Sequence, residues 1–203
     1  MYQPAAFRER DARAIEALIG AHPLATLVTC DAAGLTADHV PMLLDRSRGP
    51  HGTLVGHVAR ANPLWRRPGA ALAVFTGPDG YVSPSWYPSK RTDPRVVPTW
   101  NYAVVHAHGT LRAVDDPGLV LGIVGALTRR HEAGRDEPWH VDDAPAAYLE
   151  QMLRAIVGIE LEIDRLEAKS KLSQNRADAD RAGVVAGLTD DGATALATRM
   201  GES

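Results

Sequence analysis

The stretch GHVARAN, from Gly56 to Asn62, is the first place where this chain could bind an anion. A predicted strand over residues 53–58 gives way there to a short helical connection over 59–67. Backbone N–H groups at the start of a helical turn attract anions, and the guanidinium of Arg60 adds a bidentate donor. Neither a Walker loop nor a dinucleotide glycine fingerprint is present. Two hypotheses stay open: a phosphate site, and a surface arginine paired with an Asp or Glu, which the pattern alone favours.

A second group of polar residues lies near the C-terminus, where Lys169, Lys171 and Arg176 surround the tripeptide Ser173-Gln174-Asn175. Cationic side chains can bind an anion, and amide groups can hydrogen-bond to the edge of a polar ring. The alternative is a solvated turn in which Asn175 caps the following helix.

His106 and His108 stand two residues apart in a predicted strand, so both point to one face, as two metal ligands can. No carboxylate follows them until Glu132, so the sequence supplies no obvious third ligand. The pattern therefore favours structural histidines, and we predict no metal. Nothing marks Cys30 as an activated thiol.

Aromatic residues and prolines gather between Phe75 and Gly109, in a chain that is only 5% aromatic. Proline fixes φ and removes a backbone donor, so the segment is predicted to be a stiff loop between two strands. Aromatic rings on such a loop can contact a planar ligand. They can equally cap the core, and the pattern slightly favours this second interpretation.

The hydrophobic periodicity predicts a mainly β chain, an antiparallel barrel with helices packed outside it. A turn at Asp31–Gly34 predicts a hairpin, and residues 170–176 a polar turn. Predicted helices cover residues 4–21, 117–132 and 145–156, with a weakly helical, peripheral segment over 177–200. Predicted strands cover residues 24–30, 35–43, 53–58, 70–77, 98–114 and 159–163.

The composition excludes several classes of protein. A formal net charge of -3 provides no basic field for nucleic acid or an anionic membrane. The single cysteine excludes an internal disulfide and favours a reducing compartment. No apolar run has the length of a membrane span and no signal peptide is evident, so we expect a cytoplasmic protein without membrane contact.

Six separated motifs together resemble one family, the PaiB-type FMN-binding negative transcriptional regulators. They occur in the family's order along nearly the whole chain. The motifs are MYQPAAF (1–7), DHVPML (38–43), GHVARANPLW (56–65), GYVSPSWYPSK (80–90), VPTWNYAVVHAHG (97–109) and KLSQNR (171–176).

The resemblance implies a single split β-barrel domain of the FMN-binding type over residues 1–203, with a helical C-terminal extension from about residue 177. It further implies a homodimer that binds FMN at the subunit interface. The phosphate would lie at the strand-to-helix turn formed by His57, Val58, Ala59, Arg60 and Asn62, with Lys90 as a further cation. Trp100, Asn101 and Tyr102 would lie near the isoalloxazine ring, and Lys171, Ser173 and Gln174 would close the site.

The resemblance also implies a function. The family's name indicates a regulator, but the composition offers no DNA-reading surface, so an effect on transcription would be indirect or would need a partner. A flavin-dependent oxidoreductase is the alternative by analogy with the fold's relatives. Haem binding on the same barrel is a third possibility, kept open by the eight histidines.

Overall fold

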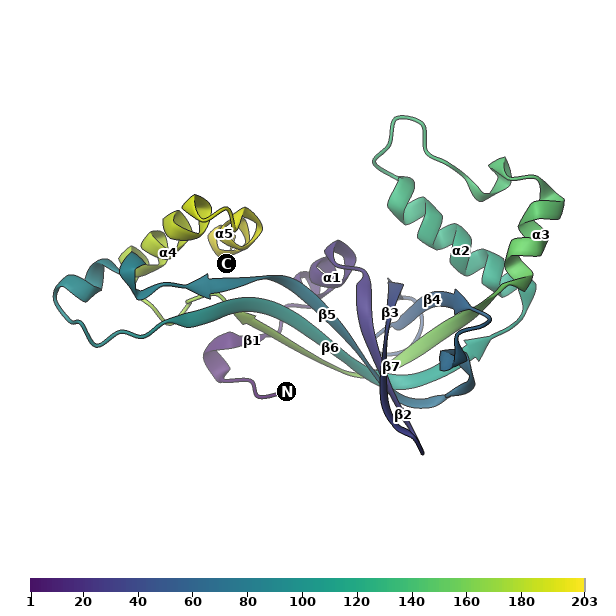
Figure 1. The fold of residues 1–203 in the computed structure, drawn as a ribbon, viewed down its shortest axis with the longest axis horizontal. Coiled ribbons are helices and arrows are strands. Elements are labelled where there is room, and N and C mark those ends of the chain that lie inside the picture. The colour runs from purple at the N-terminus through teal and green to yellow at the C-terminus, as the bar shows by residue number, and fades with distance from the viewer. Residues whose placement is uncertain (203) are drawn as a thin grey trace. The chain divides into compact units, whose positions relative to one another are not determined.

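The computed structural model describes residues 1–202, and its strands form one seven-stranded antiparallel sheet. The strand order is β1-β7-β4-β3-β2-β5-β6, and an additional pairing of β7 with β6 closes the ring of a split barrel. The predicted mainly β split-barrel fold is thereby confirmed. Figure 1 follows the strands, which are β1 (Arg8–Glu9), β2 (Leu24–Asp31), β3 (Gly34–Asp45), β4 (Thr53–Ala59), β5 (Gly69–Val82), β6 (Thr99–Val114) and β7 (Ile156–Lys171).

The hairpin of β2 and β3 forms as its turn residues predict. Asp31 pairs with Gly34 across a two-residue turn, and Gly34 has a φ of 112°, which suits glycine. Alternate residues of β2, such as Ala25 and Leu27, are fully buried. Local turn chemistry and a period of two were sufficient to predict this element.

The chain divides into two compact units, and each is described by itself. Unit 1 comprises residues 1–18, 76–105 and the described residues from Glu167 on. Unit 2 comprises residues 19–75 and 106–166. The helix α1 (Ala12–Ala21) and the strands β5, β6 and β7 each begin in one unit and end in the other.

In unit 2, two helices follow β6. The first, α2 (Pro117–Glu132), has the predicted bounds, because the Asp116 side chain accepts a hydrogen bond from the Leu119 N–H at 2.9 Å and Pro117 occupies the first turn. The second is α3 (Ala146–Arg154), which contacts α2. Apolar side chains of β4, β6 and α2 form a buried cluster: Val55, Val114, Val120, Ile123 and Leu127.

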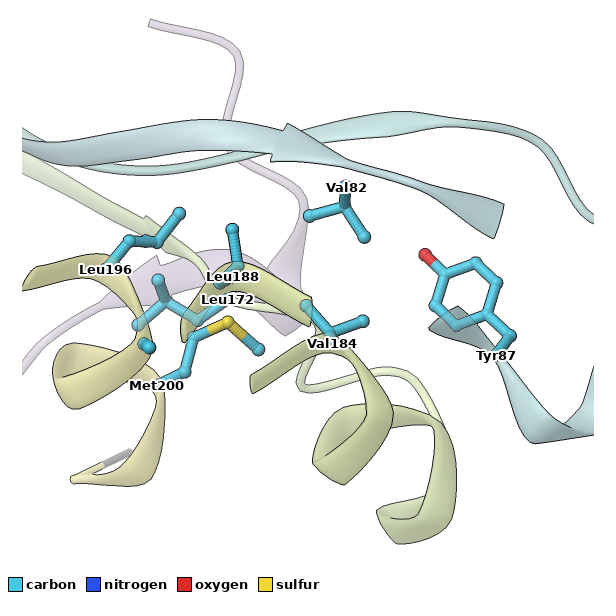
Figure 2. Close-up of a cluster of buried hydrophobic side chains, with 8 residues drawn as sticks. Val82, Tyr87, Leu172, Val184, Leu188, Leu196 and Met200 are labelled. Atoms are coloured by element: carbon cyan, nitrogen blue, oxygen red, sulfur yellow. The ribbon is translucent and has the colours of Figure 1, made fainter. Parts of the chain in front are cut away.

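In unit 1, the two C-terminal helices α4 (Asp178–Asp190) and α5 (Thr194–Gly201) form much of the core. Figure 2 shows Val184 and Leu188 of α4, Leu196 and Met200 of α5, and Val82, Tyr87 and Leu172 in one buried cluster, to which Ala197 also belongs. The prediction that residues 177–200 are peripheral is therefore wrong. An alanine-rich sequence has no strong apolar stripe, so its burial depends on partners distant in sequence.

The N-terminal helix is shorter than predicted. It begins at Ala12, because Arg8 and Glu9 form β1 and pair with Lys169 and Ala168 of β7. Ala5–Phe7 forms the short 3-10 helix η1. The other 3-10 helices are η2 (Pro63–Arg66), η3 (Pro84–Trp86), η4 (Pro88–Arg91) and η5 (Val141–Asp143).

Two strands extend beyond their predicted ends. β5 continues through Pro78 to Val82, so the proline-rich loop begins later than the sequence suggested. β7 extends to Lys171, well past the predicted end at residue 163. The extension of β5, and that of β7 from Glu167 on, fall in unit 1, where they carry residues described below.

Candidate functional site

The turn that follows β4 in unit 2 holds Arg60 in a network of intrachain bonds. Its guanidinium donates to both carboxylate oxygens of Asp115, at 2.5 and 3.1 Å. It also donates to the backbone carbonyl oxygens of Arg154 at 2.8 Å and Ile156 at 3.0 Å. Four of its five N–H groups are therefore occupied. The hypothesis that Arg60 pairs with an acidic residue describes this geometry, and one donor remains for a ligand.

The neighbouring residues of this turn have mixed environments. Val58 belongs to the core, and Ala59 ends β4. The Asn62 side chain accepts from the Leu64 N–H at 2.8 Å and donates to Asp38 at 2.8 Å, so it caps η2.

His57 is half-buried, and its Nδ1 atom has no hydrogen-bond partner among the described residues. Burial lowers the pKa of this imidazole below its ordinary value, because the charged form loses hydration. A neutral imidazole with a free nitrogen can donate to or accept from a ligand group.

The ring residues of unit 1 lie along β6 and the end of β5. Trp100 and Tyr102 are two residues apart and so share one face of the strand. The Trp100 ring meets Tyr81 edge-on, with centroids 6.3 Å apart, and its Nε1 donates to Asp79 at 2.7 Å. Trp100 is 50% exposed and Tyr81 is 49% exposed, so both rings are available to a flat ligand.

Lys169 adds positive charge next to these rings. Its ammonium lies 5.1 Å from the centroid of the Tyr102 ring and 5.6 Å from that of Tyr2, in the range of cation–π contacts. It also donates to the Tyr2 carbonyl oxygen at 3.2 Å. We call Tyr81, Trp100, Tyr102 and Lys169 the ring face.

The turn after β7 brings four predicted residues together. Lys171 Nζ donates to Thr99 Oγ1 and, at 2.8 Å, to the carbonyl oxygen of Trp100. Asn101, which is fully buried, donates from Nδ2 to Ser173 Oγ at 2.9 Å. Burial is the main cause that lowers the pKa of the Lys171 ammonium.

The Gln174 side chain makes hydrogen bonds within this turn. Its side chain accepts from the Leu172 N–H at 2.7 Å and donates to the Ser170 carbonyl oxygen at 2.5 Å. The alternative prediction that Asn175 caps the next helix is wrong, since the residue before α4 is Ala177 and makes no side-chain cap bond. The helix instead follows an extended residue, and Asn175 lines a pocket described below.

Lys90 lies in η4 of unit 1 and is exposed. Its side chain makes no hydrogen bond or ion pair with any residue from 1 to 202. It is thus a cation available to a ligand, and η4 follows Tyr87, whose ring lies 4.7 Å from the guanidinium of Arg176.

Sequence reasoning missed two partners that decide these environments. Asp115 lies 55 residues from Arg60, and no local pattern connects the two. Thr99 binds Lys171 from the start of β6, 72 residues away. The sequence pointed to Thr99 only indirectly, because Thr99 directly precedes the predicted site residue Trp100.

The paired histidines sit on the part of β6 that belongs to unit 2. Their ring centroids are 6.2 Å apart and the planes are tilted by 58°. Both side chains are half-buried. The histidine pair therefore lines one face of the strand, as the spacing predicts.

The donor set of unit 1 fits a flavin nucleotide. An isoalloxazine ring needs aromatic neighbours, and a phosphate needs cations that are not already neutralised. The exposed rings of Trp100 and Tyr81 meet the first need, and Lys90 and Lys171 meet the second.

No helix in residues 1–202 is long and apolar enough to cross a membrane.

Comparisons with known proteins agree with this chemistry. Residues 1–165 match a family model described as "Putative FMN-binding domain". The chain is 31% identical over 194 residues to the protease synthase and sporulation protein PAI 2 of Bacillus subtilis, and the match covers 94% of this chain and 90% of that protein.

Two solved structures share the fold. The FAD and haem binding protein of Mycobacterium smegmatis has a TM-score of 0.61 and 21% identity, with 86% of this chain and 78% of that one covered. The flavocytochrome Anf3 of Azotobacter vinelandii has a TM-score of 0.58 and 16% identity, with 86% and 74% covered. At these identities the likeness concerns the fold.

Proposed function

This chain belongs to the FMN-binding domain family and is an FMN-binding split-barrel protein; from that premise we propose that it works as a flavin-carrying homodimer that influences transcription through a partner. The observation that carries the proposal is the ring face of unit 1. Two of its rings, those of Trp100 and Tyr81, remain about half exposed, although aromatic side chains usually bury most of their surface.

In this proposal the twelve predicted residues divide by role. Trp100, Asn101 and Tyr102 lie beside the flavin ring, Lys171, Ser173 and Gln174 close the site, and Lys90 contributes charge. His57, Val58, Ala59 and Asn62 contact the phosphate region, with Arg60 limited to its one remaining donor. Bound FMN supplies hydride or single-electron chemistry.

A homodimer accounts for the exposure of the ring face. A flavin ring placed on a single exposed face keeps its other side in water, whereas a second copy can cover that side. The two-fold symmetry of such a dimer would produce two equivalent sites. Sedimentation with and without FMN tests this, and a monomer in both conditions contradicts it.

The ion pairs of unit 2 support an indirect effect on transcription. In unit 2, Arg48, Arg60 and Arg67 are each paired with a carboxylate, at 2.6, 2.5 and 2.7 Å. Paired arginines neutralise few DNA phosphates, and phosphate contacts dominate affinity for DNA. The name of the Bacillus subtilis relative, a sporulation protein, supports a regulatory role. Tight, specific gel shifts by the purified dimer at low salt would contradict the indirect effect.

Flavin binding at the ring face is tested by Trp100→Ala. We expect the dissociation constant for FMN, measured by quenching of flavin fluorescence, to rise about tenfold, because a ring contact contributes roughly 0.5–1.5 kcal/mol beyond the area buried. The matched control is Trp139→Ala, since Trp139 is 47% exposed but lies in unit 2. Equal losses in both variants would contradict the placement.

The absorption spectrum of the protein purified under mild conditions distinguishes the alternative functions. Flavin bands are expected, whereas a Soret band would indicate haem. If reduced nicotinamide bleached the bound flavin at a useful rate, the oxidoreductase alternative would be favoured over the regulator.

A further inference from the structure

A small pocket opens in unit 1 where β6 begins and β7 ends, and it has a volume of about 140 Å³. Phe7 lines one part of it. Its polar lining includes Thr99, Asn101, Lys171, Ser173 and Arg176. No acidic side chain lines it, so its charge is positive.

Neither of its two cations is neutralised by an acidic group in the described chain. Lys171 bonds only to a hydroxyl and a carbonyl oxygen, which leaves one of its three N–H donors free. The guanidinium of Arg176 lies 4.7 Å from the centroid of the Tyr87 ring and makes no ion pair within residues 1–202. Two such charges around one pocket attract an anion.

The polar lining of the pocket is held in place by buried contacts. Asn101 is fully buried and Ser173 is 4% exposed, and the two side chains are hydrogen-bonded to each other. Ser173 has a φ of 62°, a left-handed conformation that residues other than glycine seldom adopt. Strain of this kind persists where surrounding bonds hold it, and it is common at ligand sites. The Gln174 side chain supplies such bonds.

We propose that this pocket binds the oxyanion group of a small ligand, a carboxylate or a phosphate, between Lys171 and Arg176. Pockets that enclose a drug-sized molecule have volumes of roughly 300–1,000 Å³, so this one suits a single charged group and not a whole flavin. The proposal deepens the proposed function, on which it rests for the identity of the ligand. The oxyanion belongs either to FMN itself or to a second ligand.

The first experiment titrates inorganic phosphate into the full chain by calorimetry at constant ionic strength. We expect saturable binding that weakens about tenfold or more in Lys171→Met and in Arg176→Gln, because a hydrogen bond to a charged group is lost. The matched control is Arg91→Gln, which removes an exposed arginine of the same unit that does not line the pocket. Should Arg176→Gln fail to fold, Lys171→Met carries the same test.

The absence of saturable phosphate binding, or an equal loss in Arg91→Gln, overturns the proposal. A second titration distinguishes the two sources of the oxyanion. If phosphate competes with FMN, and Lys171→Met weakens FMN but not riboflavin, the pocket holds the phosphate of FMN, and the assignment of that phosphate to the turn after β4 is wrong. If phosphate binds equally well to the FMN-loaded chain, the pocket serves a second ligand.

Both results support an oxyanion pocket. Failure of FMN itself to bind the wild-type chain would contradict the proposed function and leave the phosphate result to stand alone. The two failures are therefore distinguishable.

Discussion

The cationic side chains of the two units have different partners. In unit 2, arginines such as Arg48, Arg60 and Arg67 bind carboxylates. In unit 1, Lys169 and Arg176 lie over aromatic rings, and Lys171 binds neutral oxygens. Each unit has an exception, since Arg66 of unit 2 lies over Trp65 and Arg95 of unit 1 pairs with Asp93.

The difference shows that a cation's partners determine whether it can receive a ligand. A carboxylate neutralises an arginine and occupies its donors, whereas a ring or a carbonyl leaves the net charge in place. Arg60 has the stronger sequence signal for a phosphate site, because it stands in a strand-to-helix turn. The structure nevertheless leaves more unneutralised charge at Lys171 and Arg176.

The largest expected effect comes from disturbing the packing of α4 in unit 1, in the cluster that includes Tyr87, the ring beside Arg176. In Gly183→Ala, the added methyl would overlap the Trp86 carbonyl oxygen and displace α4 from η3. We expect the free energy of unfolding to fall by about 1–3 kcal/mol in urea denaturation. Gly122→Ala in α2 is the control, because nothing lies within 4 Å of its added methyl. It should raise the free energy of unfolding by up to about 1 kcal/mol. A similar loss of stability in both variants would show that overlap with Trp86 is not the cause.

An intermediate effect is expected from giving unit 2 a free cation. Asp115→Asn removes the charge that neutralises Arg60, while the bonds to the carbonyl oxygens of Arg154 and Ile156 still hold the guanidinium. In an Arg176→Gln background, which weakens the pocket of unit 1, we expect this change to raise the affinity of the turn after β4 for phosphate about threefold to tenfold, as one charge-assisted contact becomes available. Calorimetry measures this affinity, and an unchanged value would show that neutralisation by Asp115 is not what limits Arg60.

The smallest expected effect concerns His57. Burial places its pKa in the folded chain below the ordinary value near 6.5, so the unfolded chain binds more protons as the pH falls through that range. Stability from this group is fully present above about pH 6.5 and is lost below it. Because the side chain is only half-buried and keeps part of its hydration, we expect a smaller change than in the two preceding variants. Urea unfolding at several pH values checks this, and His57→Gln should remove it.

Much of the fold could be predicted from local signals. The turn at Asp31–Gly34 predicted a hairpin, and the hydrophobic periodicity of residues 117–132 predicted α2 with the bounds that the structure has. The segments 177–200 and 4–21 were predicted less well. Their final structure depends on long-range contacts, namely the packing of α4 and α5 on Tyr87 and Leu172 and the pairing of β1 with β7.

The candidate site was predicted in its residue types but not in its environments. The motif KLSQNR indicated an anion and amide site, and the structure joins Asn101 to Ser173 and Lys171 to Trp100. The motif contained no information on the pocket, because Thr99 and Asn101 are 72 residues from their partners. The roles of the twelve residues stay predictions, which the binding measurements above test.

The sequence by itself determined where strands alternate, which family the motifs resemble and which side chains carry charge. Those properties depend on residue types and on neighbours a few positions away. Only the tertiary structure decided which charges are neutralised, because Asp115 reaches Arg60 across 55 residues whereas no carboxylate in the described chain reaches Lys171. The free energy of an ion pair depends on the distance between two atoms, and folding sets that distance.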